Sequence, residues 1–209
     1  MRATIERANL LKSLNHVHRV VERRNTIPIL SNVLIRAEGS NLAMKATDLD
    51  LEINESTAAM VEQAGATTVP AHLLYEIVRK LPEGGEVMLA TNPDGTSMTV
   101  ISGRSNFRLQ CLPQSDFPEL TAGTFTHTFR LNSTAIKGLI DKTQFAISNE
   151  ETRYYLNGIY LHAIDVGGAM KIRSVATDGH RLARAEYDAP AGSEGMPGII
   201  VPRKTVSEI

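Results

Sequence analysis

The stretch ATDGHRL at residues 176–182 ends a run in which apolar and polar residues alternate, and a weaker copy, ATDLDL, stands at residues 46–51. The two Thr-Asp pairs begin at positions 47 and 177, which are 130 residues apart. A second pair of matching stretches, TTVP at 67–70 and IIVP at 199–202, repeats at nearly the same step, 132. Self-similarity at a constant step predicts a chain built from similar modules.

Apolar spacing predicts a strand, a helix and three more strands, and the first half of the chain shows this order twice. The expected strands cover residues 1–6, 32–37, 41–46, 50–56, 66–69, 86–91, 97–102 and 106–112, and the expected helices cover 8–21 and 70–81. Residues 113–123 are rich in proline, glycine and polar side chains, which is typical of a linker.

The second half repeats this pattern only in part. A strand is expected at 125–131, a helix after a cap at Asn132 or Ser133, and strands at 156–163, 169–176 and 182–187. No counterpart of residues 78–112 follows, and an unfinished sheet would expose an open edge. The chain is therefore expected to be a fragment of a longer protein, cut inside its second module.

The 209 residues carry a formal net charge of −1, with 42% hydrophobic and 22% charged side chains. This balance is typical of a globular protein and does not suit a simple polycation, although it leaves room for a local basic surface. The sequence has no run of 18 apolar residues and no signal-peptide core, so no membrane association is expected. The lone Cys111 cannot form an internal disulfide, which fits a reducing cytoplasm.

Common motifs of nucleotide hydrolysis, zinc proteolysis, dinucleotide binding and serine esterases (GxxxxGKS/T, HExxH, GxGxxG, GxSxG) do not occur in the sequence. Asp48, Asp50 and Glu52 share one face of an expected strand, where they could hold a divalent metal or simply face solvent. Asp178 and His180 could act as acid and base, although no nucleophile accompanies them. A metal-dependent hydrolase that uses these residues is one alternative function.

Basic side chains gather on the expected helices or at their ends: Arg19, Arg23, Arg24, Arg79, Lys80, Lys137, Lys142, Arg203 and Lys204. Helices on one side of the sheets would present them as a positive wall that binds phosphates without reading bases. An ordinary solvated helix face explains the same pattern. Tyr154 and Tyr155, beside Arg153, could stack on nucleic acid, anchor a partner or pack inward.

A site for a partner is expected around the repeated stretch. Gly179 allows a tight turn, and Leu156 and Leu182 could line an apolar pocket with Thr177 and Arg181 at its rim. Peptide-docking sites combine an apolar floor with a few polar groups in this way. A protein-interaction module without DNA contact is therefore a second alternative.

The chain resembles the bacterial DNA sliding clamps, the beta subunits of the replicative DNA polymerase III. Matching motifs lie along the whole chain: TIPILSN at 26–32, ATTVP at 66–70, LPEG at 81–84, SGRS at 102–105, DFP at 116–118, RYYLNG at 153–158, VATDGHRL at 175–182 and VPRK at 201–204. RYYLNG and ATDGHRLA, at this separation, are highly specific to that family.

The resemblance implies an α+β fold of DNA clamp (processivity-fold) domains, each made of two β-α-β-β-β units with helices on one side of antiparallel sheets. It assigns residues 1–122 to a complete first domain and 123–209 to a truncated second domain, with the third domain absent. Two full-length chains would close head to tail into a ring around duplex DNA, whereas this chain alone is expected to form no native ring. Such a clamp is not an enzyme, and no cofactor or metal is expected.

The resemblance also implies partners and site residues. The candidates for DNA contact are Arg23, Arg24, Lys137, Lys142, Tyr154, Tyr155, Arg203 and Lys204, of which Arg24, Tyr154 and Tyr155 match DNA-touching positions of the family. Half of a pocket for glutamine- and leucine-rich peptides is expected from Leu156, Thr177, Gly179, His180, Arg181 and Leu182. Glu150 replaces a glutamine of well-known relatives and would repel phosphate. The expected partners are duplex DNA, the polymerase III catalytic subunit, the clamp loader, and other replication and repair polymerases.

Overall fold

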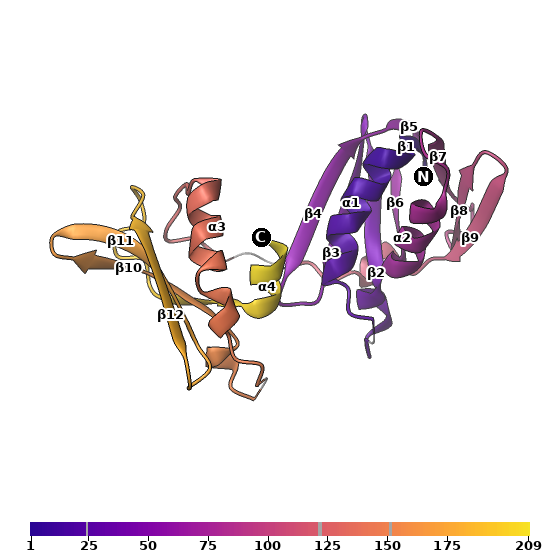
Figure 1. The fold of residues 1–209 in the computed structure, drawn as a ribbon. Helices are drawn as coiled ribbons and strands as arrows, with labels where there is room; N and C mark the ends of the chain where they lie inside the picture. Colours follow the sequence, from indigo (N-terminus) through magenta and orange to yellow (C-terminus); the bar gives the residue numbers. More distant parts are fainter. Residues whose placement is uncertain (24, 121–122, 151) are drawn as a thin grey trace. The chain divides into compact units, whose positions relative to one another are not determined.

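The computed structural model describes residues 1–23, 25–120, 123–150 and 152–209 (Figure 1). The chain divides into two compact units, Met1–Thr121 and Ala122–Ile209. Within the described ranges, no helix is both long enough and apolar enough to cross a membrane.

The first unit contains two antiparallel sheets, one with the strand order β5-β1-β7-β8-β9 and one with the order β4-β3-β2-β6. The strands of the first sheet are β1 (Arg2–Glu6), β5 (Met60–Gln63), β7 (Glu86–Thr91), β8 (Ser97–Ser102) and β9 (Ser105–Gln110). Those of the second sheet are β2 (Asn32–Glu38), β3 (Asn41–Thr47), β4 (Glu52–Ala58) and β6 (Gly65–Pro70). Exposed and more buried residues alternate along most of β2 and β3, which therefore have one face on the core.

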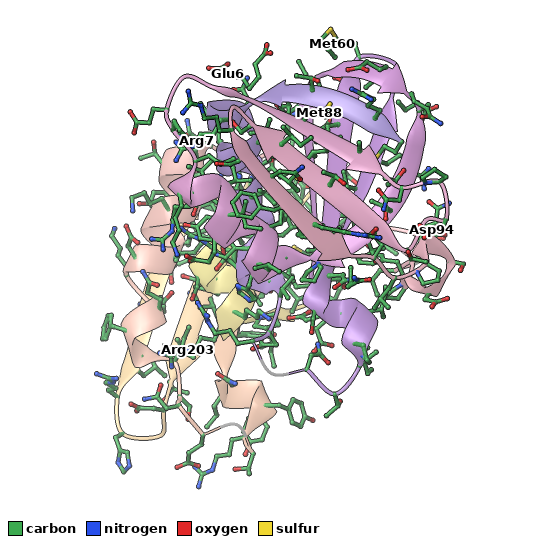
Figure 2. The ribbon with its side chains drawn as sticks, turned by 90° about the vertical axis from the view of Figure 1, so that its right-hand side faces the viewer. Glu6, Arg7, Met60, Met88, Asp94 and Arg203 are labelled. Atoms are coloured by element: carbon green, nitrogen blue, oxygen red, sulfur yellow. The ribbon has the colours of Figure 1, made fainter. Side chains whose placement is uncertain are left out.

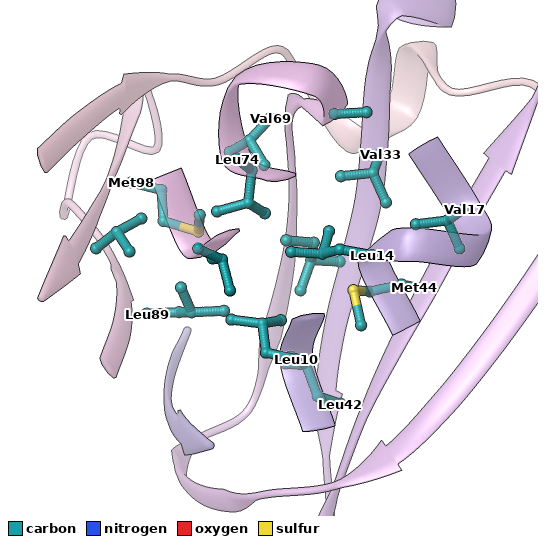
Figure 3. Packing of buried hydrophobic residues seen from close by; sticks show 14 of the residues in the cluster. Leu10, Leu14, Val17, Val33, Leu42, Met44, Val69, Leu74, Leu89 and Met98 are labelled. Carbon is teal, nitrogen blue, oxygen red and sulfur yellow. The ribbon is translucent and has the colours of Figure 1, made fainter. Parts of the chain in front are cut away.

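Two helices, α1 (Arg7–Val20) and α2 (Ala71–Lys80), pack against each other, and α1 also contacts β3 and β4. Leu10, Leu14 and Val17 recur at the spacing of one helix face, and all three are fully buried. Figure 3 shows Leu10 and Leu14 between Met44 of one sheet and Leu89 of the other, with Val17 next to Met44. The two sheets of the first unit therefore share a single core, into which each helix packs one of its faces.

The side chain of Arg7 fastens the start of α1 to the end of α2. Its Nε donates to the carbonyl of Val78 at 3.1 Å, and its Nη2 donates to the carbonyl of Arg79 at 2.7 Å. Carbonyls in the last turn of a helix have no partner within the helix, so this guanidinium acts as a cap. Figure 2 labels Arg7 beside Glu6, where β1 passes into α1.

The second unit contains α3 (Ser133–Asp141), an antiparallel sheet and α4 (Arg203–Glu208). The strands of the sheet are β10 (Gly158–Val166), β11 (Ala169–Thr177), β12 (Leu182–Asp188) and β13 (Ile199–Pro202), in the order β12-β11-β10-β13. Of the two predicted caps, Asn132 is the one used, because its Oδ1 accepts the N–H of Thr134 at 2.8 Å. Leu139 of α3 packs with Ile172 and Ala185 of the sheet in a buried cluster.

Short 3-10 helices also occur in the described ranges: η1 (Pro28–Ser31), η2 (Gln114–Asp116), η3 (Gln144–Ala146) and η4 (Tyr154–Leu156). Two of them lie where the sequence suggests something else. η2 falls in the predicted linker, and η4 occupies the first residue of the strand expected at 156–163, which begins only at Gly158.

The strand predicted at 125–131 is wrong. None of the strands described in the sheet of the second unit pairs with these residues. An extended segment without a neighbour lacks the hydrogen-bond ladder that defines a strand. β5 was not expected, because Met60–Gln63 is short and mostly exposed. The strand expected at 50–56 begins only at Glu52, since residues 48–51 form a turn.

Candidate peptide and nucleic-acid interfaces

The repeated stretch forms a hydrogen-bonded turn between β11 and β12. The Asp178 carboxylate accepts the backbone N–H groups of His180 at 3.0 Å and Arg181 at 2.9 Å through Oδ1. The Thr177 hydroxyl accepts the N–H of Gly179 at 3.1 Å and donates to the carbonyl of Arg181 at 2.7 Å. Gly179 has a φ of +90°, a backbone conformation in which a residue with a side chain would be strained. The turn is therefore held in one shape by its own side chains.

Arg181 is fixed on two sides. Its Nε lies 2.9 Å from Oδ2 of Asp178, and its guanidinium carbon lies 5.7 Å from the centre of the Phe145 ring. The backbone N–H groups of Arg181 and His180, and then the Arg181 side chain, lower the pKa of Asp178 to about 2. A carboxylate with so low a pKa stays ionised near neutral pH, so Asp178 serves the turn and is a poor general acid or base for His180.

Large apolar side chains stand exposed beside this turn. The exposed fraction is 67% for Leu182 and 57% for Phe145. Leu156 is half-buried in η4, just before β10, and the β10–β11 register puts the start of β10 at the same end of the sheet as Thr177 and Leu182. The predicted pocket residues thus come together at one end of the sheet of the second unit, although Leu156 lies in a 3-10 turn instead of a strand.

The first unit contains the same turn between β3 and β4. Asp48 accepts the N–H groups of Asp50 at 3.1 Å and Leu51 at 2.8 Å, and the Thr47 hydroxyl accepts that of Leu49 at 3.0 Å. Leu49 has a φ of +80° and takes the place of Gly179. A bulky residue in the left-handed region is unusual, so the repeat has preserved the shape of the turn despite the change of residue.

The surroundings of the turn differ between the two units. Glu52 pairs with Thr47 as Leu182 pairs with Thr177, and η1 precedes β2 as η4 precedes β10. In the first unit Leu30 of η1 is only 3% exposed, because Phe117, itself 6% exposed, packs over it. The predicted linker therefore covers in the first unit the place that stays open in the described part of the second unit.

The acidic residues proposed as metal ligands are otherwise engaged. Asp48 and Asp50 lie in the turn and not on a strand face, and Asp48 Oδ1 already accepts two N–H groups. Glu52 lies 3.2 Å from Lys45 Nζ and accepts the Asn54 amide at 2.8 Å. Among the described residues no group of three or more potential ligands is placed to hold a metal ion. The expectation that three acids share one strand face is therefore wrong.

The basic side chains of α1 form a stripe. Lys12, His16 and Arg19 are exposed at spacings of four and three residues, so they share one side of the helix, and the exposed Arg23 follows after the helix has ended at Val20. His16 Nδ1 lies 2.7 Å from a carboxylate oxygen of Glu55, which moderates the charge of the stripe when His16 is protonated. Arg24, predicted to contact DNA, lies outside the described residues.

The basic candidates of the second unit make contacts that leave most of them accessible. Lys137 Nζ lies 2.7 Å from Asp141, one helical turn further on, and Lys142 Nζ lies 5.4 Å from the centre of the Tyr187 ring. The exposed Arg203 donates to Asn149, and Lys204 is half-buried. The exposed Lys137–Asp141 ion pair is weak and exchanges readily with a phosphate.

Tyr154 and Tyr155 are 77% and 55% exposed, and their rings meet edge to face with centroids 5.6 Å apart. Arg153 Nε lies 2.9 Å from Glu150, whose negative charge is thereby partly balanced. Both rings are open to solvent, so neither packs inward, as the sequence had left open. An exposed aromatic pair beside an ion pair suits contact with a polyanion or a protein partner.

Two family models match the chain. The DNA polymerase III beta subunit, N-terminal domain, matches residues 1–121, and the central domain of the same subunit matches residues 130–209. A beta sliding clamp from Caulobacter vibrioides is 55% identical over 208 residues, and one from Pseudomonas aeruginosa is 41% identical over 210 residues. Each match covers 100% of this chain and 56% of the relative. The chain therefore spans little more than half the length of these relatives.

Solved structures agree. A beta sliding clamp from Caulobacter crescentus superposes with a TM-score of 0.96 at 55% identity, over 100% of this chain and 55% of that chain. A DNA polymerase III subunit beta sliding clamp from Bartonella birtlesii, bound to griselimycin, gives 0.95 at 57% identity and the same coverage. The predicted α+β clamp fold is confirmed, and the chain belongs to the DNA polymerase III beta subunit family, the beta sliding clamps.

Proposed function

We propose that this chain is part of a DNA sliding clamp, a ring that encircles duplex DNA and tethers the replicative polymerase. The observation that carries the proposal is the match of both units, in order and at 55% identity, to a beta sliding clamp. The role is not catalytic. Tethering raises the effective concentration of the polymerase at the primer end without adding contacts at its active site.

The DNA contacts in this proposal are weak, numerous and made to phosphates. The α1 stripe with Arg23 and Arg24 serves the first unit, and Lys137, Lys142, Arg203 and Lys204 serve the second, with Tyr154 and Tyr155 beside them. Support comes from the exposure of most of the described members and from the exposed, weak ion pair of Lys137 with Asp141. Phosphate contacts position a protein without fixing its register on a sequence, which is what sliding requires.

The partner site in this proposal is the open end of the sheet of the second unit, formed by Leu156, Thr177, Gly179, His180, Arg181 and Leu182. Support comes from the comparison of the two units, because the same place in the first unit is covered by Phe117. A short glutamine- and leucine-rich peptide would bury Leu182 and meet the preorganised Arg181. The polymerase III catalytic subunit, the clamp loader and other replication and repair polymerases would carry such peptides.

The assembly in this proposal is a head-to-tail dimer of full-length chains in the cytoplasm. Residues 1–122 form its first domain, and residues 123–209 belong to its second. No cofactor or metal takes part.

The test is retention on DNA. A chimaeric clamp carries residues 1–209 in place of the matching segment of the Caulobacter vibrioides relative and is loaded onto nicked circular DNA. A ring stays on the circle through gel filtration and leaves after the DNA is cut, because it slides off the ends. A protein that binds DNA without encircling it would be retained equally on circular and cut DNA, and that result would refute the proposal.

Charge reversal separates the clamp from a module that makes no DNA contact. Arg23→Glu with Lys142→Glu in the chimaera should lower retention and loading, most clearly at low salt, because fewer phosphate contacts remain. Unchanged loading and retention would contradict the assigned DNA-facing surface.

A further inference from the structure

A cleft of about 630 Å³ lies in the first unit. Its floor includes Leu34, Ala43 and Phe117, and its rim includes Arg36, Gln114 and Glu119. A volume of this size is typical of sites that hold a drug-sized molecule or a few residues of peptide. The cleft therefore has the dimensions and the mixed lining of a ligand site.

The cleft lies on the face of the β4-β3-β2-β6 sheet that points away from the helices. Val33 and Ile35 of β2 are fully buried in the core, so Leu34 and Arg36, between and after them, point to the opposite face. β2 pairs with β3, which sets Arg36 opposite Ala43. The cleft thus opens on the face of the sheet opposite to α1, and it meets the basic stripe at Glu55, whose carboxylate lies 2.7 Å from His16 Nδ1.

This sheet face already binds one segment of the chain. The stretch after Leu112, which bridges to Thr68, crosses the face and is anchored by Phe117 in a cluster with Leu30 and Leu34. Gln114, at the start of this stretch, lines both the large cleft and a neighbouring one of about 270 Å³. A peptide with a central apolar residue would bind beside the connecting stretch in the same manner as Phe117.

The charges of the cleft are unequally engaged. Lys45 lies 3.2 Å from Glu52, and Glu55 lies 2.7 Å from His16. The side chains of Arg36 and Glu119, by contrast, make no hydrogen bond or ion pair with the residues that the structure describes. One exposed cation and one exposed anion thus remain on the rim to select a ligand.

The two rim charges lie toward opposite ends of the cleft. Arg36 lies opposite Ala43, near the start of β3. Glu119 lies near the other end of β3, because the backbone N–H of the next residue, Leu120, faces the carboxylate of Glu52. Glu52 in turn lies opposite Thr47. The four residue steps from 43 to 47 along the strand span about 13 Å at about 3.3 Å each. In an extended peptide, residues i, i+2 and i+4 face one side and cover that span.

We propose that this cleft binds an extended peptide of a partner protein, with an acidic residue at i, a large apolar residue at i+2 and a basic residue at i+4. The acidic residue pairs with Arg36, the apolar residue fills the floor beside Leu34 and Phe117, and the basic residue pairs with Glu119. The side-chain hydroxyl of Ser56 and the side-chain amide of Gln114, which line the cleft, are available to the peptide backbone. The site is independent of the partner site of the second unit.

The test is a fluorescence-polarisation titration of the full 209-residue chain with labelled Glu-Ser-Leu-Ser-Lys. We expect saturable binding, weakened at least about tenfold by Arg36→Glu and by Ala43→Trp, which fills the floor without changing charge. Glu119→Lys should weaken this peptide and strengthen Glu-Ser-Leu-Ser-Glu, because the second rim charge is then complementary to an acid.

Matched controls carry the same charge changes outside the cleft. Arg104→Glu and Glu83→Lys, at exposed positions in turns, should leave both affinities unchanged. Thermal unfolding of each variant checks that it is folded. If Arg36→Glu is unstable, Ala43→Trp and Glu119→Lys still test the cleft. The proposal would be overturned if the wild type showed no saturable binding. It would also be overturned if Ala43→Trp left the affinity unchanged and Glu119→Lys did not shift the preference from Glu-Ser-Leu-Ser-Lys to Glu-Ser-Leu-Ser-Glu.

Discussion

Truncating Leu182 to alanine should weaken peptide binding by the second unit. Full burial of a leucine side chain is worth about 1.5–3 kcal/mol. Because Leu182 is 67% exposed in the free chain, a peptide that covers it completely gains roughly two thirds of that, about 1–2 kcal/mol. The loss corresponds to an affinity about 5–30-fold lower. The cost to folding is smaller, about 0.5–1 kcal/mol, since only one third of the side chain is buried already.

The assay is fluorescence polarisation of a labelled glutamine- and leucine-rich peptide with the 209-residue chain. Leu73→Ala is the matched control, because Leu73 is 50% exposed but belongs to α2 of the first unit. Leu156→Asp should abolish binding, since it places a charge in the apolar part of the site. Equal affinity of Leu182→Ala and wild type, with the wild type binding saturably, would refute the assignment of this surface.

Further predictions concern the β11–β12 turn and the stretch after Leu112. Gly179→Ala should destabilise the second unit by about 1–2 kcal/mol, because alanine is strained at a φ of +90°. The added Cβ meets no atom within 4 Å, so backbone strain is the whole cost, and urea unfolding measures this loss of stability. Asp178→Ala should lower the melting temperature at pH 6, and the difference from wild type should shrink as the pH falls from about 4 to about 2, because the depressed pKa of Asp178 stabilises the folded state only while the carboxylate is ionised. Phe117→Ala should cost the first unit about 3–5 kcal/mol, since the ring is 6% exposed; denaturant unfolding measures this, with the 77% exposed Phe125 as the control position.

Each of these predictions has an outcome that contradicts it. A melting-temperature difference for Asp178→Ala that stays constant down to pH 2 would show that the carboxylate charge does not stabilise the turn. A Gly179→Ala variant as stable as wild type would show that the turn relaxes without cost. A loss below about 1 kcal/mol for Phe117→Ala would mean that the stretch after Leu112 is not anchored to the sheet face.

The sequence predicts most of the fold because period-two and period-3.6 patterns depend only on which face of each element is buried. The face of α1 that carries Leu10, Leu14 and Val17 follows directly from their spacing. Residues 125–131 show the limit of this reasoning, since their pattern suits a strand but a strand also needs a neighbour. Pairing between distant segments is a tertiary property that local periodicity does not contain.

The candidate site was predictable in composition but not in its surroundings. The stretch at 176–182 identifies the turn, and its own side chains set the turn geometry. Sequence gives no sign that Phe117 covers the corresponding place in the first unit, because a stretch rich in proline and polar residues is typical of a linker. The contribution of Phe145, which lies against Arg181, was also missed. Its only signal is an aromatic residue in the polar segment after α3.

The cleft beside Phe117 was not predictable either. Arg36 and Ala43 are ordinary outward-facing residues of two strands, and only the course of the connecting stretch places Gln114 and Glu119 next to them. Sites built from one sheet face and a distant segment of chain have no local sequence signature. Direct titration is therefore the appropriate way to find their ligands.

The most direct test of the clamp assignment is the length of DNA made in a single polymerase binding event. The chimaeric clamp described above is loaded onto a primed circular template with the Caulobacter vibrioides polymerase and clamp loader, and a trap captures any polymerase that dissociates. The proposed function predicts products much longer than those made without a clamp, and shorter products with Leu182→Ala because the tether is weaker. Products no longer than those of the polymerase alone, from a folded chimaera and under conditions where the unmodified relative supports long synthesis, would contradict it.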